Sequence, residues 1–307
     1  MQSAVQVEDL VKKFGTVTAV DGISFQVEQG EVFGILGPNG AGKTTILEII
    51  EGLQTPTEGL VKVLGRDIRT DARNIKARIG VQLQSSAYYD YLNLTEILSL
   101  LGSFYPNRVT PDTLLEQVGL LDRAKSRVGE LSGGQKQRFA VAASLVNDPE
   151  LVILDEPTTG LDPQARRNLW SLVGEIHRRD VTVVLTTHYM EEAEVMCDRL
   201  AIMDHGKLLA VDSPTNLISQ IEATYVVKLV MAKPLNESQF ASLNGSVELV
   251  QTGEDNTYLL RLKNDPHALQ SVLDEISKAD LGLEHLEITP VTLEDVFLEL
   301  TGAELRD

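Results

Sequence analysis

The chain has 307 residues, of which 43% are hydrophobic, and a formal net charge of −18. This length accommodates one large or two modest domains, and the acidic balance argues against binding to nucleic acid or to anionic lipid headgroups. No apolar run reaches the roughly 18 residues that a membrane span needs, and the first residues lack the features of a signal peptide. Contact with a membrane would therefore require a protein partner. The single cysteine, Cys197, predicts a core position and a reducing cytoplasm.

Strand and helix patterns alternate along the first 220 residues. Short apolar or alternating runs predict strands at 5–10, 18–27, 32–36, 61–64, 79–83, 151–154, 181–186 and 199–204. Helical spacing predicts helices at 43 to about 53, 94–104, 111–118, 135–146, 163–177 and 190–197. This alternation predicts an α/β fold with a mostly parallel sheet, interrupted by a helical subdomain at about residues 85–147.

A domain boundary is predicted near residues 213–221, which gives domains at 1–218 and 222–307. In the second domain the patterns run strand 225–230, helix 238–243, strands 246–250 and 257–262, helix 266–278 and strand 283–288. This βαββαβ order predicts a small α+β domain of ferredoxin-like type. A last helix is expected to start at Thr292, with Asp295 in a capping-box-like position. Its apolar face would comprise Leu293, Val296, Phe297 and Leu300.

The segment "GPNGAGKTT" fits the pattern G-x-x-x-x-G-K-[ST] and lies between a predicted strand and a predicted helix. Glycines let the backbone curl so that its N–H groups face a phosphate. Lys43 is expected to reach the β- and γ-phosphate oxygens, and Thr44 to hold Mg²⁺. The nucleotide-binding residues predicted in this segment are Gly37, Asn39, Gly40, Gly42, Lys43, Thr44 and Thr45.

Two carboxylates follow the apolar run "LVIL". Ligands bind beyond the carboxyl ends of strands in open α/β sheets. Asp155 is therefore expected to hold Mg²⁺ through its water shell, and Glu156 to polarise the attacking water as a general base. The alternative is that these carboxylates only solvate the end of the strand. The phosphate-binding pattern around Lys43, earlier in the chain, disfavours it.

Two further side chains follow strands on the same predicted edge. His188 comes just after one strand and is expected to donate to the γ-phosphate, although a lone histidine there would also suit a helix cap. A glutamine after the strand at 79–83 would contact Mg²⁺ or water. Gln84 is preferred as this catalytic and metal-binding residue because it follows the strand, and Gln82 is the competing candidate.

The segment "LSGGQ" provides a second helix start with bare glycines, which suits another phosphate. Since the first loop already holds one nucleotide, the second start is useful if it closes over the nucleotide of another copy. Two copies arranged head to tail would then enclose two ATP molecules in a symmetric interface. The residues expected to cap the neighbour's γ-phosphate are Ser132, Gly134 and Gln135.

Walker A at 37–45, "LSGGQ" at 131–135, Walker B at 151–156 and His188 occur together in this order. Residues 5 to 215 thus resemble the nucleotide-binding subunit of an ATP-binding cassette (ABC) transporter, a P-loop NTPase with a mixed sheet and a helical subdomain. The resemblance implies that Asp162 in "GLDP" contacts the opposite cassette. It also implies that Phe14 stacks on adenine, where many relatives have tyrosine. Leu83 replaces a frequent proline, which leaves the choice between Gln82 and Gln84 open.

The segment "TLEDVFLELTG" resembles the C-terminal end of ATP-binding subunits of drug-resistance and ABC-2-type exporters, although a generic amphipathic helix would also account for it. The resemblance implies an ATPase that uses ATP and Mg²⁺. It would be peripheral on the cytoplasmic face of the cell membrane and would contact the membrane only through a separately encoded permease. The alternatives are an importer ATPase with a C-terminal regulatory domain and a soluble non-transport ABC ATPase. The single cassette and the acidic balance disfavour the latter.

Overall fold

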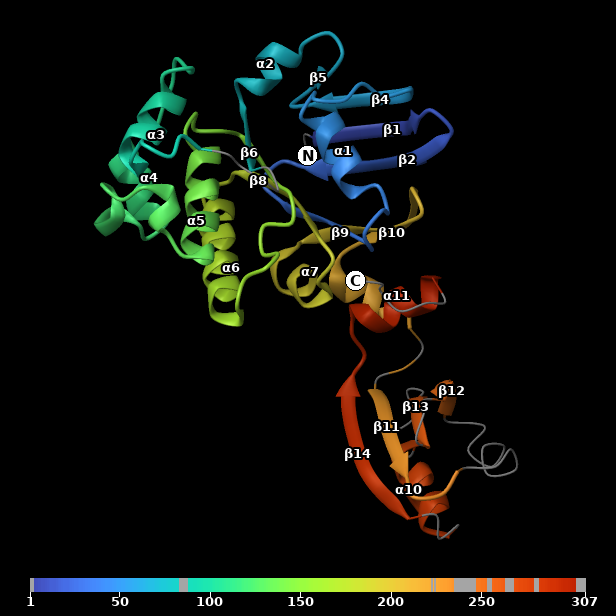
Figure 1. Cartoon of the computed structure of the whole chain (residues 1–307). Helices are drawn as coiled ribbons and strands as arrows, with labels where there is room; N and C mark the ends of the chain where they lie inside the picture. The colour runs from blue at the N-terminus through green and yellow to red at the C-terminus, as the bar shows by residue number, and fades with distance from the viewer. Residues whose placement is uncertain are drawn as a thin grey trace. The chain divides into compact units, whose positions relative to one another are not determined.

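The computed structural model describes residues 3–82, 88–221, 223, 225–234, 247–252, 256–262, 268–278 and 282–301. The chain divides into two compact units: the first contains Met1–Pro214 and Ala303–Asp307, and the second contains Thr215–Gly302 (Figure 1). Within the described ranges, no helix is long and apolar enough to cross a membrane.

A six-stranded sheet forms the centre of the first unit, in the order β10-β9-β3-β8-β7-β6. Its strands are β3 (Val32–Leu36), β6 (Ile79–Gln82), β7 (Leu151–Leu154), β8 (Thr182–Thr187), β9 (Arg199–Asp204) and β10 (Lys207–Asp212). Five strands run parallel, and β10 pairs antiparallel with β9. Every residue of β3 and β7 is buried, as expected for strands covered on both faces. The residues that follow β3, β7 and β8 therefore lie along one edge of the sheet.

The second sheet is antiparallel, in the order β2-β1-β4-β5. Its strands are β1 (Ser3–Phe14), β2 (Val17–Glu28), β4 (Glu58–Val63) and β5 (Arg66–Asp67). One hydrophobic core joins this sheet to β3 and to α1 (Lys43–Ile50). At its centre, the rings of Phe25 and Phe33 stack with their centroids 5.4 Å apart. This shared core fixes α1 and the loop before it against both sheets.

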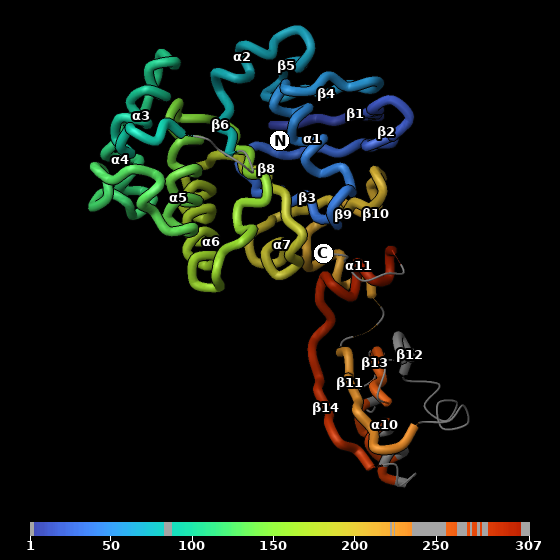
Figure 2. Tube along the Cα trace, viewed as in Figure 1, coloured from blue at the N-terminus to red at the C-terminus, as the bar shows by residue number. Residues whose placement is uncertain are grey.

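The helices α3 (Leu94–Gly102), α4 (Pro111–Gln117) and α5 (Gly133–Ser144) gather to one side of the sheets (Figures 1 and 2). All three fall inside the segment predicted to be helical. The remaining helices of this unit are α2 (Ala72–Lys76), α6 (Pro163–His177) and α7 (Met190–Met196), and α8 (Pro214–Ser219) begins at the break between the units. Short 3₁₀ turns at Leu121–Arg123 and Val128–Glu130 lead into α5.

Cys197 lies in the core, as its isolation in the sequence predicts. It is buried, and a Cβ added to Gly34 would lie 2.7 Å from its sulfur. Burial raises the pKa of the Cys197 thiol far above its ordinary value. The Cys197 side chain therefore contributes to core packing and remains a neutral thiol.

The second unit contains an antiparallel sheet in the order β12-β13-β11-β14. Its elements are β11 (Tyr225–Met231), β12 (Val247–Thr252), β13 (Thr257–Leu262), α10 (Ala268–Lys278), β14 (Leu283–Pro290) and α11 (Leu293–Thr301). The helix expected at 238–243 lies outside the described residues, so the complete βαββαβ order stays a prediction.

The start of α11 has the expected polar cap. Asp295 Oδ2 accepts hydrogen bonds from the backbone N–H of Thr292 at 2.9 Å and from its hydroxyl at 3.1 Å. Arg261 of β13 ties the helix to the sheet, because it donates to Glu299 at 2.9 Å. Three residues of the predicted apolar face, Leu293, Val296 and Phe297, are buried, and the fourth, Leu300, is 41% exposed.

Several predicted element boundaries are wrong. The helix α5 begins at Gly133 instead of Gln135, because Ser132 supplies its N-cap. The helix α1 ends at Ile50 instead of near Leu53, since Gly52 has a φ of +69° and interrupts the helix. Strands β5 and β10 were not predicted, because a two-residue strand and an edge strand carry little periodic signal.

Candidate active site

The loop between β3 and α1 requires glycine at three positions. A Cβ at Gly37 would lie 2.4 Å from the carbonyl oxygen of Met203, and one at Gly42 would lie 2.4 Å from that of Ala19. Gly42 also has a φ of +102° and Gly40 one of +84°, which L side chains rarely adopt. The loop is thus held in a tight curl against its neighbours, an arrangement that suits a phosphate.

Lys43 is the first residue of α1 and is only 4% exposed. Its ammonium donates to the carbonyl oxygens of Gly37 at 2.8 Å and Pro38 at 3.2 Å, and lies 3.4 Å from Glu156 Oε1. Burial lowers the pKa of Lys43, and the charge of Glu156 opposes that shift. The loop therefore presents a buried cation next to the curled backbone.

The two carboxylates lie directly after β7 and share one positioning group. The Thr186 hydroxyl donates to Asp155 Oδ1 at 2.6 Å and accepts from the backbone N–H of Glu156 at 2.8 Å. Glu156 has a φ of +45°, a strained backbone for a non-glycine residue that is frequent at functional sites. Thr186 was not predicted from the sequence, because a threonine within a buried strand resembles any other β-branched strand residue.

His188 joins this group from the end of β8. Its Nδ1 lies 3.6 Å from Glu156 Oε1, and its side chain is 18% exposed. Lys43 at the start of α1 and His188 after β8 therefore both approach the carboxylate of Glu156, which follows β7. A buried carboxylate between a lysine and a histidine, beside a phosphate-binding type of loop, can activate a water molecule next to a bound phosphate group.

Two of the three residues predicted to hold Mg²⁺, Thr44 and Asp155, lie next to each other, and the third, Gln84, is outside the described residues. Thr44 Oγ1 lies 3.5 Å from Asp155 Oδ1, so a hydroxyl and a carboxylate oxygen stand side by side. Among the residues that the structure describes, no group of three or more His, Cys, Asp or Glu could hold a metal. A site with one carboxylate suits Mg²⁺, which keeps several waters and binds substrate phosphates.

A second cluster forms where α5 meets α6. Ser132 caps α5: its hydroxyl accepts from the backbone N–H of Gln135, whose side chain accepts from the backbone N–H of Ser132 at 2.9 Å. A Cβ at Gly134 would lie 2.8 Å from the Cβ of Ala165 in α6, so the helix starts pack closely. Asp162 is the N-cap of α6 and accepts from two backbone N–H groups.

The remaining predicted residues are placed as follows. Phe14 ends β1 and is 45% exposed, with the Lys12 ammonium 4.7 Å from its ring centre. Asn39 is exposed and Thr45 is half-buried. Gln82 is the last residue of β6 and is buried, whereas Gln84 lies outside the described residues.

Comparison with known proteins shows the family to which the chain belongs. Residues 20–159 match the ABC transporter family model, and residues 219–301 match that of the C-terminal domain of DrrA1-3-like ATP-binding proteins. The chain is 38% identical to the Nod factor export ATP-binding protein I of Paraburkholderia xenovorans, covering 100% of this chain and 99% of the relative. The chain belongs to the ABC transporter family.

Other similar proteins agree with this assignment. The ABC protein is 36% identical to the linearmycin resistance ATP-binding protein LnrL of Bacillus subtilis, over 99% of this chain and 100% of that one. The solved structure of cbiO1 from Clostridium perfringens, part of the ABC transporter complex cbiONQ, is also similar. It has a TM-score of 0.65 and 26% identity, over 72% of this chain and 92% of that one. A dimeric cassette bound to ADP and Pi has a TM-score of 0.62 and 27% identity, over 68% and 98%. The chain is an ATP-hydrolysing subunit of export type.

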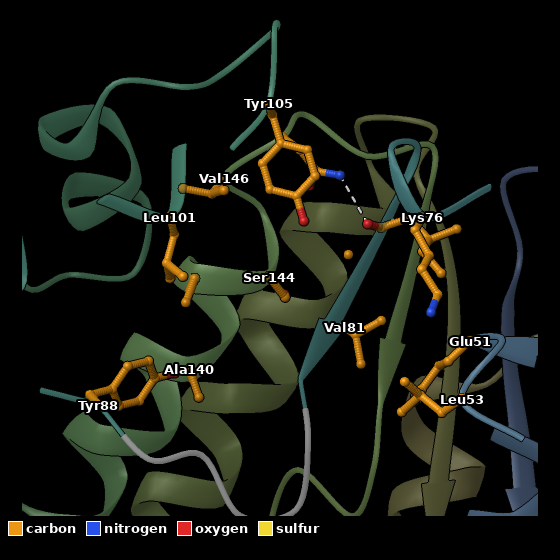
Figure 3. A pocket seen from close by; sticks show the side chains of 14 residues that line it. Glu51, Leu53, Lys76, Val81, Tyr88, Leu101, Tyr105, Ala140, Ser144 and Val146 are labelled. Carbon is orange, nitrogen blue, oxygen red and sulfur yellow. Dashed lines mark hydrogen bonds between the residues drawn. The ribbon is translucent and has the colours of Figure 1, made fainter. Parts of the chain in front are cut away.

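The ABC cassette also has a groove between the end of α1, β6 and the helices α3 and α5 (Figure 3). Glu51 lines it and is 3% exposed, and its Oε2 has no hydrogen-bond partner among the described residues. Burial, assisted by the negative charges of Asp155 and Glu48, raises the pKa of Glu51 to about 7. The folded cassette therefore favours the neutral carboxyl.

Replacing Glu51 with glutamine is expected to stabilise the protein increasingly as the pH rises. The folded state holds this proton more tightly than the unfolded state, so wild type loses stability between pH 4.5 and about 7. Relative to wild type, the variant should gain about 2–3 kcal/mol in free energy of unfolding between pH 5 and pH 8. Urea unfolding at both pH values measures this. The exposed Glu58→Gln is the control, and a pH-independent difference for Glu51→Gln would contradict the prediction.

Proposed function

We propose that the chain drives export by closing head to tail on a second copy, with ATP held at both interfaces. The main support for this proposal is that Lys43 and His188 both lie close to the Glu156 carboxylate, beside the glycine loop. In this proposal Lys43 and the loop hold the β- and γ-phosphates. Glu156 accepts a proton from the attacking water, and His188 donates to the γ-phosphate.

Thr44 and Asp155 would hold Mg²⁺, together with the glutamine that follows β6, for which Gln84 remains the preferred residue. When bound, Mg²⁺ would neutralise charge that develops on the phosphates. Thr186 would keep Asp155 and the Glu156 backbone in fixed relation, because its hydroxyl contacts both. Phe14 would offer its exposed ring to the adenine.

The second copy would supply Ser132, Gly134 and Gln135 to the γ-phosphate, and Asp162 to the interface. The α5 helix start supports this, because Ser132 and Gly133 are exposed and the positive end of the helix dipole lies there. ATP would then favour the closed dimer since it contacts both copies.

Mixing two inactive variants tests the head-to-tail arrangement. Lys43→Ala removes the phosphate-binding cation. Gly133→Asp places a negative charge at the α5 start, where a Cβ meets nothing within 4 Å, so the fold should tolerate it. In a mixed dimer, the intact Lys43 of one copy faces the intact α5 start of the other.

Each variant alone should be inactive, and an equal mixture should recover up to about a quarter of the wild-type ATPase rate, since half of the dimers each have one intact site of two. Two Lys43→Ala preparations mixed together are the matched control. No recovery, with both variants folded and dimerising, would show that each copy completes its own site.

We further propose that a separately encoded permease anchors the chain to the cytoplasmic face of the membrane. Tyr89, Tyr91 and Phe104, in and beside the helical segment, are 57%, 68% and 73% exposed, which suits a protein contact. Co-expression with the neighbouring open reading frame should bring the chain into the membrane fraction. Equal recovery without any membrane protein partner would contradict this proposal.

We also propose that the transporter exports a compound related to those named for the relatives. Relatives with similar identity carry different names, Nod factor export and linearmycin resistance. The cassette sequence thus does not select the compound, and the permease is proposed to do so. An importer would instead require a binding protein that delivers the substrate, which a gene encoded nearby would reveal.

A further inference from the structure

A buried carboxylate contacts the residue that precedes His188. Glu192 of α7 is 0% exposed, and its Oε2 accepts a hydrogen bond from the Thr187 hydroxyl at 2.8 Å. Its other oxygen lies 3.6 Å from Nε of Arg166 in α6. A charged group this deeply buried is costly unless it is paired, and none of the catalytic roles proposed above uses it.

The hydrogen bonds around this carboxylate involve the two residues that flank His188 in the sequence, Thr187 and Tyr189. The Thr187 hydroxyl that donates to Glu192 also accepts from the backbone N–H of Tyr189 at 2.9 Å. One hydroxyl therefore bridges the residues on both sides of His188. The centroid of the Tyr189 ring lies 4.1 Å from that of the His188 ring and 4.3 Å from Cζ of Arg166.

Arg166 connects this cluster to the start of α6. Its backbone N–H donates to the carbonyl oxygen of Asp162 at 3.0 Å within the first turn of that helix. The preceding residue, Ala165, is the one against which Gly134 of α5 packs. The first turn of α6 therefore lies between the α5 start and the backbone around His188.

The ion pair between α6 and α7 is loose. Arg166 Nε and Glu192 Oε1 are buried, and neither has a hydrogen-bond partner in the described part of the chain. Their separation of 3.6 Å exceeds hydrogen-bond range. An approach of less than about 1 Å would bring the two atoms into that range, so a small shift of α6 would tighten the cluster.

We propose that Arg166 and Glu192 are positioning residues that hold His188 against Glu156 from the first turn of α6. This rests on the proposed role of His188 at the γ-phosphate. Glu192 fixes the Thr187 hydroxyl, which orders the backbone around His188, and Arg166 supports the adjoining Tyr189 ring. Because α5 packs on the same turn, the phosphate-capping helix start and His188 are linked within one copy.

Glu192→Gln tests this proposal in the full-length protein. Glutamine retains an acceptor for Thr187 but removes the charge that faces Arg166. The kcat for ATP should fall about tenfold, a typical size for coupling between sites, while the KM for ATP should change less than twofold. Arg166→Met should behave in the same way, and the double variant should be no slower than either single variant. The exposed neighbours Glu191→Gln and Arg167→Gln are matched controls with wild-type kcat.

A His188→Ala background separates positioning from general destabilisation. If Glu192 acts through His188, Glu192→Gln should not lower the residual single-turnover rate of His188→Ala any further. Arg166→Lys, which retains the charge, should recover most of the activity lost in Arg166→Met. A wild-type kcat for Glu192→Gln, or an equal tenfold loss on the His188→Ala background, would overturn the proposal. Neither result would alter the proposed function, which fails separately if wild type and Glu156→Gln hydrolyse ATP at equal rates.

Discussion

Glu156→Gln is expected to bind ATP, to lose almost all turnover and to accumulate as a closed dimer. Glutamine preserves the shape of the side chain but cannot accept the proton of the attacking water. The loss of a general base typically costs at least about 100-fold in rate. ATP binding should persist, because Lys43 retains its contacts to Gly37 and Pro38 and no longer pairs with a carboxylate at position 156.

Light scattering at millimolar Mg-ATP, combined with an assay of phosphate release, measures both effects. Wild type should return to monomer as ATP is consumed, whereas the variant should remain dimeric. The control is Glu175→Gln, an exposed carboxylate on α6. If Glu156→Gln stays monomeric with its permease present, the sandwich arrangement is wrong, and if it hydrolyses ATP normally, another group is the base.

Lys43→Ala is expected to abolish nucleotide binding at micromolar concentrations. The variant loses the side-chain cation that lies at the glycine loop, and charge-assisted hydrogen bonds contribute roughly 1.5–3 kcal/mol each. With contacts to two phosphates, the dissociation constant for Mg-ATP should rise more than about 100-fold. The substitution also leaves Glu156, at 9% side-chain exposure, without its lysine partner.

Equilibrium binding of a fluorescent ATP analogue measures the change in affinity. Lys136→Ala, at an exposed position of α5, is the control and should bind like wild type. Thermal melting verifies that Lys43→Ala remains folded. Unchanged affinity in a folded variant would remove the assignment of this loop as the phosphate cradle.

Local spacing was enough to predict the loop at Gly37 to Thr45 and the strand ends at Asp155 and His188. A phosphate loop needs glycine at fixed offsets and a lysine next to them, and a buried strand followed by carboxylates has a recognisable pattern. The edge of a parallel sheet then implies that such residues meet. The structure agrees, with Glu156 between Lys43 and His188.

The sequence was less informative where neighbours in space decide the outcome. It did not indicate Thr186, because a threonine in a strand looks like any β-branched residue until its hydroxyl is seen between Asp155 and Glu156. The sequence placed Leu300 on the apolar face of the last helix but did not indicate that its side chain is 41% exposed. Helical periodicity gives the direction of a side chain but not the extent of the surface that covers it.

By itself the sequence determined the kind of chemistry, because that depends on residue types at short, fixed separations along the chain. Only the tertiary structure decided how those groups are held. It placed Glu156 in a strained backbone conformation, buried Glu192 behind His188, and set Arg166 3.6 Å from it. These features arise from packing between residues far apart in sequence, and their energies depend on burial and distance, which local pattern does not encode.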